Sequence, residues 1–258
     1  MTFVVVVPKV DFLYAIQFPN FQSQAIEYTR GRDQYPAFLF GAESSVHLPA
    51  DQLFSDAQLW PDFSLSASFC PLRPQGGFLS AVVSPSGTLA QFGLRIADGT
   101  GPDSSRVQLY YSDQGDDAPS VSTAVIAEFD VSPSLTGYWN RLAMKVKDDD
   151  VTLFLECSPH GTVTAANRTR VLTFQNGSTV YVGQAGPEFS DAKFEVGHHF
   201  LEHSKRSAFS AKIIATYEIH PQKLVRSSAF RTLPICPDNL IGLHPLFQDT
   251  HRHTNKQT

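Results

Sequence analysis

Apolar and polar residues alternate most clearly along residues 138–157, which read YWNRLAMKVKDDDVTLFLEC. Two runs share this period-two pattern, and their apolar members of one parity are Leu142, Met144 and Val146, then Val151, Leu153 and Leu155. The other parity of the first run holds Trp139, Arg141, Ala143, Lys145 and Lys147. Such alternation is typical of half-buried strands, and three consecutive aspartates between the runs, Asp148, Asp149 and Asp150, favour a turn. The pattern predicts a β-hairpin ending at Cys157, with the Trp139 ring covering one end of a core.

Shorter runs of β-branched, aromatic or alternating residues predict strands along the rest of the chain. These runs are 26–28, 37–40, 46–48, 62–69, 77–83, 89–97, 106–112, 121–129, 163–171, 178–182 and 212–219. Near the start, Asp11 is placed to cap a short helix that Pro19 stops. Turn signals recur about every 8–12 residues, and no helical run of the ~10–15 residues that a βαβ unit needs occurs before position 195. The pattern therefore predicts an all-β, antiparallel sandwich or barrel.

Charge divides the chain unevenly. The 258 residues fit one large all-β domain, or one domain with a tail, and the net charge is −5. Residues 196–258 hold 8 Lys/Arg against 4 Asp/Glu, and residues 1–195 hold 12 against 21. Seven of the nine histidines also follow position 195. This shift in composition marks residues 196–210 as an atypical segment, and we expect residues 239–258 to form a poorly ordered tail.

Features that would indicate a membrane protein or a nucleic-acid-binding protein are missing from the sequence. No apolar run approaches the ~20 residues that a membrane span needs. Residues 1–7 are apolar but carry no basic flank, so we do not interpret them as a signal peptide. An isoelectric point near 6.0 does not support nucleic-acid binding.

Three cysteines, Cys70, Cys157 and Cys236, lack the C-x-x-C spacing of zinc ribbons and thioredoxins. An odd count allows one disulfide and a free thiol. Two sequons begin at Asn167 and Asn176, and they are compatible with a secreted glycoprotein.

Blocks along the chain resemble a known family. They read VDFLYAIQFP, EYTRGRDQYPAFLFG, DFSLSASFCPLRPQGGFLSAVV, YWNRLAMKV, VTLFLEC and VYVGQAGPEF. Their order is similar to that of the thrombospondin N-terminal-like, laminin-G-like domain, and the nearest pattern is that of the multiplexin collagens, types XV and XVIII. The resemblance covers residues 10–195 and resumes over 212–236, which implies a domain at 10–238 with an insert at 196–210. The family lacks this insert, which has no clear periodicity and an abruptly different composition, so we interpret it as a gene-model artefact such as translated intron, with a genuine surface loop as the alternative.

The resemblance implies a two-sheet jelly-roll sandwich without enzymatic activity or a required cofactor. It would be the N-terminal non-collagenous module of a secreted collagen of the extracellular matrix or basement membrane, mediating cell adhesion and matrix contacts. The Gly-X-Y triplets and endostatin domain of multiplexins do not occur in this sequence. The full-length protein would be a homotrimer. The resemblance also pairs Cys157 with Cys236 and leaves Cys70 as an unpaired, buried thiol.

Candidate sites each have a plain structural alternative. The three aspartates at 148–150 are candidate calcium ligands, since laminin-G-like domains sometimes hold calcium at one rim, but they lack the D-x-D-x-D-G pattern and a solvated turn is favoured. His198, His199 and His203 suggest a metal site, against which we favour an exposed loop.

Two further sets concern glycans. Glu188, Asp191 and Glu195 superficially match the paired carboxylates of jelly-roll glycosidases, but strand alternation would place Glu188 and Asp191 on opposite faces, and Pro187 favours a loop. A loose basic set is a candidate heparin or heparan sulfate site, supported by the heparin binding of thrombospondin N-terminal domains, with a scattered solvated surface as the alternative. Its members are Lys205, Arg206, Lys212, Lys223, Arg226 and Arg231, of which the last four lie outside the insert.

The predicted function is therefore a non-enzymatic matrix module that binds matrix proteins or glycosaminoglycans. The alternatives are a lectin-like carbohydrate-binding domain on the same fold and, less favoured, a jelly-roll glycosidase.

Overall fold

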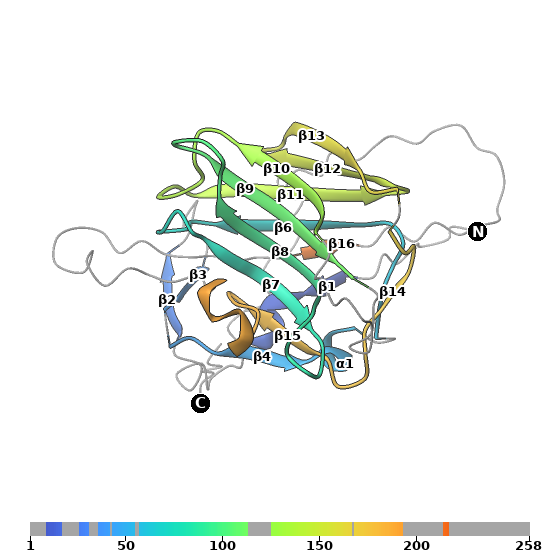
Figure 1. Cartoon of the computed structure of the whole chain (residues 1–258). Coiled ribbons are helices and arrows are strands. Elements are labelled where there is room, and N and C mark those ends of the chain that lie inside the picture. The colour runs from blue at the N-terminus through green and yellow to red at the C-terminus, as the bar shows by residue number, and fades with distance from the viewer. Residues whose placement is uncertain are drawn as a thin grey trace, which may run out of the picture.

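The chain folds into two antiparallel six-stranded sheets packed face to face (Figure 1). The computed structural model describes residues 9–16, 26–30, 36–41, 43–54, 57–112, 125–166, 168–192 and 214–216. The sheet nearer the viewer in Figure 1, called here the front sheet, has the order β10 (Val125–Val131), β9 (Ser105–Tyr111), β8 (Ala90–Asp98), β7 (Gly77–Val83), β15 (Thr179–Val182) and β4 (Val46–Pro49). The back sheet has the order β1 (Lys9–Asp11), β16 (Ile214–Thr216), β6 (Phe63–Phe69), β11 (Asn140–Lys147), β12 (Asp150–Leu155) and β13 (Ser158–Thr164). The predicted all-β, antiparallel sandwich is confirmed.

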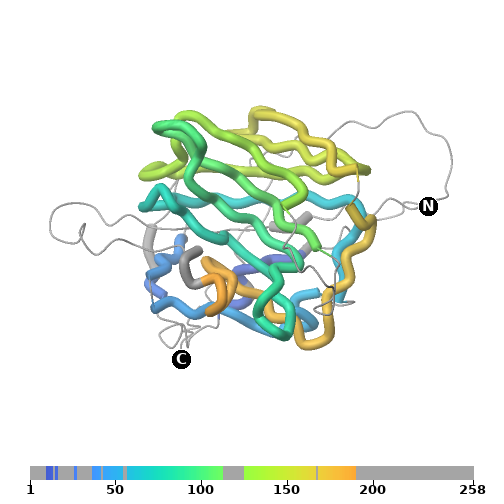
Figure 2. Tube along the Cα trace, in the orientation of Figure 1, coloured from blue at the N-terminus to red at the C-terminus, as the bar shows by residue number. Residues whose placement is uncertain are grey.

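Smaller elements lie around the sheets (Figure 2). They are the pair β2 (Ile26–Arg30) and β3 (Pro36–Phe40), the pair β5 (Gln58–Leu59) and β14 (Leu172–Thr173), the one-turn helix α1 (Ala50–Leu53), and the 3₁₀ segments η1 (Phe12–Ala15) and η4 (Pro187–Ala192). The helix start predicted at Asp11 is confirmed, because its carboxylate accepts a hydrogen bond from the Leu13 N–H at 3.0 Å. No helix in this described part is long and apolar enough to cross a membrane.

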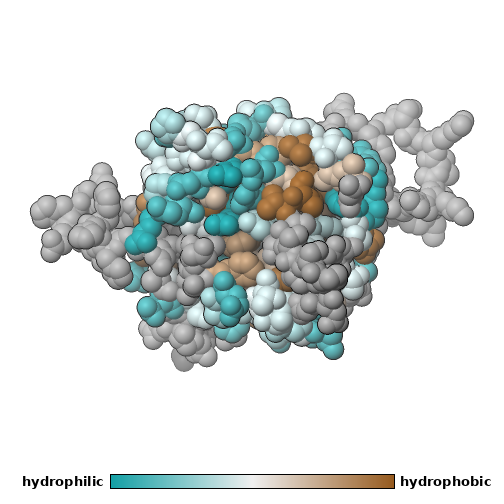
Figure 3. Space-filling view, in the orientation of Figure 1, coloured by the Kyte–Doolittle hydropathy of each residue, from teal (hydrophilic) through white to brown (hydrophobic). Residues whose placement is uncertain are grey.

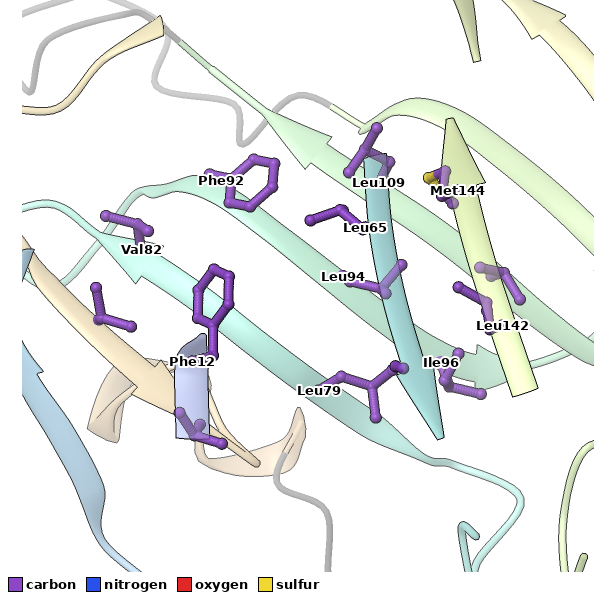
Figure 4. Close-up of a cluster of buried hydrophobic side chains, with 14 of the residues drawn as sticks. Phe12, Leu65, Leu79, Val82, Phe92, Leu94, Ile96, Leu109, Leu142 and Met144 are labelled. Carbon is purple, nitrogen blue, oxygen red and sulfur yellow. The ribbon is translucent and has the colours of Figure 1, made fainter. Parts of the chain in front are cut away.

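The core between the sheets follows directly from alternation. Strand β6 buries every second residue, so Phe63, Leu65, Ala67 and Phe69 face inward and its three serines face outward. Figure 4 shows the facing side chains of β6, β8 and β11, including Leu65, Leu94 and Met144, meeting between the sheets. Leu65 and Leu94 are 1% exposed and Met144 is 0% exposed, so the two layers exclude water from their shared face.

The β-hairpin predicted from residues 138–157 is confirmed. Strands β11 and β12 pair antiparallel with Lys147 opposite Asp150, which leaves Asp148 and Asp149 as a two-residue turn. Asp150 therefore belongs to the strand and not to the turn, a one-residue correction. Trp139 is half-buried, and among the described residues it is Trp60 that packs against the main core.

The strand predicted at 163–171 is wrong. A strand instead runs from Ser158 to Thr164, and the short β14 follows at Leu172–Thr173. Strand β13 is an edge strand with mostly exposed residues, so it lacks the apolar alternation that predicts a strand. The turn before it consists of Glu156 and Cys157, with φ of 48° and 67°, positions that usually carry Asn or Gly. Strand β5 and helix α1 were also missed. Residues 196–210 and 239–258 lie outside the described residues.

Candidate binding surfaces

Arg170 forms ion pairs with two carboxylates of the acidic turn between β11 and β12. Arg170 places its two terminal nitrogens 3.5 Å from Asp148 Oδ1 and 3.2 Å from Asp149 Oδ1. The Asp150 carboxylate accepts a hydrogen bond from the Thr164 hydroxyl at 2.9 Å. No group of three or more His, Cys, Asp and Glu side chains is placed to hold a metal ion in the part of the chain that the structure describes. The structure thus gives these aspartates arginine and hydroxyl partners, and the calcium hypothesis gains no support from them.

Arg168 fixes the same turn from beneath. Its side chain is fully buried, its Nε donates to the Asp148 carbonyl at 3.0 Å, and its Nη2 donates to the Pro61 carbonyl at 2.6 Å and also to the Asp148 carbonyl. The guanidinium carbon lies 5.8 Å from the centre of the Tyr111 ring, and Nη2 lies 3.8 Å from Asp62 Oδ1. Arg168 therefore ties the β11–β12 turn to the loop that enters β6.

The outer face of the back sheet carries a line of cations along β11. Arg141, Lys145 and Lys147 share this face because Leu142, Met144 and Val146 occupy the inward parity. We call these three residues the β11 cation row. Lys145 is half-buried and Lys147 exposed, and neither forms an ion pair within the described ranges. The Arg141 backbone N–H donates to Glu156 Oε1 at 2.8 Å, which places one acid at that end of the row.

Hydroxyl side chains flank the row on both sides. Strand register sets Ser68 opposite Arg141 and Ser64 opposite Lys145 on β6, and it sets Thr152 opposite Lys145 on β12. Residues that are directly opposite on paired strands project to the same side of a sheet. Register also sets the exposed Asp150 carboxylate opposite Lys147. The face therefore combines cations and hydroxyl donors, which suit anionic oxygens, with one acid near each end of the row.

The outer face of the front sheet has different chemistry. Register places Phe78, Arg95, Gln108 and Glu128 directly opposite one another on β7, β8, β9 and β10. We call these four residues the front-sheet row. Its aromatic end, Phe78, belongs to a second apolar cluster. The other members are Ala81, Val83, Ala90, Tyr110 and Ala185, with Tyr181 and Phe189 packed against it. This cluster explains why all seven residues of β7 are buried.

Hydrogen bonds run along the front-sheet row and extend it. Arg95 Nη1 lies 3.3 Å from the Tyr110 hydroxyl, which in turn donates to Gln108 Oε1 at 3.3 Å. Gln108 Nε2 donates to Glu128 Oε2 at 2.6 Å, and Arg106 lies 3.5 Å from the other oxygen of Glu128. In Figure 3 hydrophilic residues form a band across the upper part of this face, next to a hydrophobic patch.

Two of the three carboxylates considered for a glycosidase, Glu188 and Asp191, lie in η4, so the segment that begins at Pro187 is not a strand, as Pro187 indicated. Glu188 is exposed within Pro187–Ala192, a 3₁₀ segment, so strand alternation does not apply to Glu188 and Asp191 and the argument that used it was wrong. Glu195 lies outside the described residues.

The structure describes one of the two sequon asparagines, Asn176, and two of the three cysteines, Cys70 and Cys157. Asn176 is exposed in a turn, and the hydroxyl of its sequon partner Ser178 is buried and donates to Gln91 Oε1 at 2.6 Å. Cys70 is free and buried, as predicted, and burial raises the pKa of its thiol to about 11. Cys157 is disulfide-bonded. Its pairing with Cys236 stays a prediction.

Several predicted site residues lie outside the described residues. They are Asn167, His198, His199, His203, Lys205, Arg206, Lys212, Lys223, Arg226, Arg231 and Cys236. The heparin site predicted from the last four basic residues is therefore untested. Both surfaces described above were absent from the predicted sites. The β11 cation row was visible in the parity of the sequence, whereas the front-sheet row depends on register across four strands.

Comparisons with known proteins give a partial match. No family model matches the chain. It is 25% identical over 163 residues to the human collagen alpha-1(XVIII) chain, a match covering 63% of this chain and 9% of that protein. Among solved structures, domain 4 of the arabinanase AbnA from Geobacillus stearothermophilus aligns with a TM-score of 0.44 and 15% identity, covering 75% of each chain. The SAP-like pentraxin of Limulus polyphemus aligns with a TM-score of 0.42 and 12% identity, covering 74% of this chain and 72% of that one. The chain thus spans 9% of the length of its curated relative.

Proposed function

We propose that the chain is a non-catalytic module of the extracellular matrix that binds sulfated glycosaminoglycans on the outer face of its back sheet. The β11 cation row is the observation that carries the proposal. Arg141 and Lys145 are four residues apart on one strand, which corresponds to about 13 Å, and Lys147 extends the line by about 7 Å. An extended polyanion can contact all three cations at once, and serine and threonine hydroxyls beside them can donate to sulfate oxygens.

The charge close to the β11 cation row affects glycosaminoglycan binding more than the net charge of the chain does. Residues 1–195 hold 12 Lys/Arg against 21 Asp/Glu, yet exposed charges farther apart than about 8–10 Å are largely screened at physiological salt. Lys145 and Lys147 have no ion-pair partner within the described ranges, so a sulfate group does not have to displace a carboxylate from them. Arg170, by contrast, is engaged by the acidic turn.

The matrix location rests on the similarity to human collagen XVIII. We infer that the chain is an N-terminal non-collagenous module of a secreted, collagen XV/XVIII-like protein. Matrix proteins and heparan sulfate are its proposed partners. In a collagen homotrimer three copies of the module would engage one glycan, which raises avidity without any new contact.

Elution from heparin-agarose tests the proposal. We expect the wild-type module to elute above ~0.15 M salt, and each of Lys145→Gln and Lys147→Gln to weaken binding about threefold. Arg106→Gln on the front sheet is the matched control, because it also removes one positive charge. Equal shifts for Lys145→Gln and Arg106→Gln, or elution of the wild type only at very low salt, would contradict a specific site.

A further inference from the structure

We propose that the front-sheet row is a second binding site, which recognises the carboxylate of an acidic sugar through Arg95. It lies on the opposite sheet from the β11 cation row and uses none of the same residues. The inference therefore does not depend on binding of sulfated glycans, and each can fail alone.

Arg95 presents an unused hydrogen-bonding edge. Its Nη1 is directed to the Tyr110 hydroxyl, but its Nε is buried without a hydrogen-bond partner, and no bond engages its Nη2 in the described part of the chain. Arg95 also lacks an ion-pair partner among these residues. The Nε and Nη2 donors form the fork that binds a carboxylate through two parallel hydrogen bonds. Because Nε is buried, a carboxylate that binds this edge has to reach into the surface beside the half-buried Arg95 side chain, where both donors lack a partner in the described part of the chain.

Aromatic rings support Arg95 from below. Its guanidinium carbon lies 5.7 Å from the centre of the Phe78 ring, which itself lies 4.9 Å from the Tyr110 ring and 5.9 Å from the Phe189 ring. Gly93 makes this arrangement possible, because a Cβ there would lie 3.0 Å from the Phe78 ring. The rings hold the guanidinium in place, so less side-chain freedom is lost when a ligand binds.

The rest of the row favours a sugar over a polyanion. Glu128 lies two strands, or ~10 Å, from Arg95, and its ion-pair partner Arg106 lies beside the row on the intervening strand β9. Their side chains are 42% and 30% exposed, and they provide an acceptor and a donor. Sugar hydroxyls can donate to Glu128 and accept from Arg106. A ligand with several negative groups would instead be repelled by the Glu128 carboxylate. A sugar ring with one carboxylate and several hydroxyls can therefore bind Arg95 through the carboxylate and Glu128 and Arg106 through the hydroxyls.

The test compares methyl β-D-glucuronide with methyl β-D-glucoside, which differ only in the carboxylate. We expect the glucuronide to cause saturable shifts of the β8 and β9 amides in ¹⁵N NMR spectra, with a Kd on the order of 1 mM, and the glucoside to bind at least about tenfold more weakly. Arg95→Lys keeps the charge but loses the fork, so it should weaken glucuronide binding roughly tenfold.

Lys145→Gln, on the opposite sheet, serves as the control that leaves glucuronide binding unchanged. Equal binding of the two sugars, unchanged binding by Arg95→Lys, or no saturable shift in the millimolar range would each overturn the proposal. If far-UV circular dichroism shows that Arg95→Lys is unfolded, the comparison of the two sugars on the wild-type chain decides. Heparin elution of a folded Arg95→Lys variant, expected to match the wild type, keeps this result separate from the back-sheet proposal.

Discussion

Replacing Arg168 by alanine should destabilise the fold far more than replacing its neighbour Arg170. The Arg168 side chain is fully buried, and it supplies the hydrogen bonds to the carbonyls of Asp148 and Pro61 described above. Its removal leaves those carbonyls without this donor and the Asp62 carboxylate without its nearest cation. Breaking a buried, charge-assisted network of this kind costs about 3–5 kcal/mol. Arg170 is 49% exposed, so its ion pairs with Asp148 and Asp149 are worth about 0–1 kcal/mol.

Urea denaturation followed by tryptophan fluorescence measures both changes. Trp60 packs against the core and immediately precedes Pro61, so its emission should report the loss of the anchored loop. We expect the midpoint of Arg168→Ala to fall by about 1.5–2.5 M if m is near 2 kcal/mol/M, and that of Arg170→Ala by less than about 0.5 M. Both substitutions leave the N-x-T sequon at Asn167 intact, so a change in glycosylation would not confuse the comparison.

The comparison can refute the reasoning in two ways. If the two variants lose equal stability, burial of the Arg168 guanidinium does not determine its contribution. If Arg168→Ala loses less than about 1 kcal/mol, the carbonyls of Asp148 and Pro61 must find water at little cost, and the turn is not anchored as described.

Three further predictions test the core, the backbone and the buried thiol. Phe92→Ala should cost about 3–5 kcal/mol in urea denaturation, because the ring is 0% exposed between the sheets, and a cost under about 1 kcal/mol would contradict that packing. Gly183→Ala should destabilise by about 1–3 kcal/mol more than Gly137→Ala. Both glycines have positive φ, but only at position 183 would an added Cβ contact a ring, at 2.7 Å from Phe40, so equal shifts in melting temperature would contradict this contact. Burial raises the pKa of Cys70 from 9.0 to about 11, so stability present below pH 9 should be lost as pH rises toward 11, and Cys70→Ala should flatten this decline in denaturation midpoints.

Strands with strong local patterns could be predicted from the sequence. Strand β7 was predicted with the bounds that the structure shows, and β6 to within one residue, because β6 alternates regularly and β7 is a continuous apolar run between turn signals. The edge strand β13 could not be predicted, since an edge strand need not bury an apolar face. Its preceding turn at Glu156 and Cys157 also lacks the Asn-Gly chemistry that identifies a hairpin.

The two binding surfaces also differ in how far they could be predicted from the sequence. The parity of β11 alone placed Arg141, Lys145 and Lys147 on one face, so the back-sheet site could have been found from one strand. The front-sheet row requires the pairing of four strands, and the β7–β8 pairing shifts register between Phe78 and Ser80. A shift of one residue moves every side chain to the other face of a sheet, so no local pattern could have placed Arg95 beside Gln108 and Glu128.

The core also explains why the two surfaces can act independently. In each sheet, the apolar side chains on alternate positions face the shared interior. The polar side chains on the positions between them therefore face outward, away from the opposite sheet. The β11 cation row and Arg95 are thus separated by two layers of backbone and a core in which Leu65 and Leu94 are 1% exposed. Substitutions on sites this far apart with no shared partner usually add within about 0.5 kcal/mol. The effects of Lys145→Gln and Arg95→Lys on stability should therefore add, and a clear departure from additivity would show that the two faces are coupled through the core.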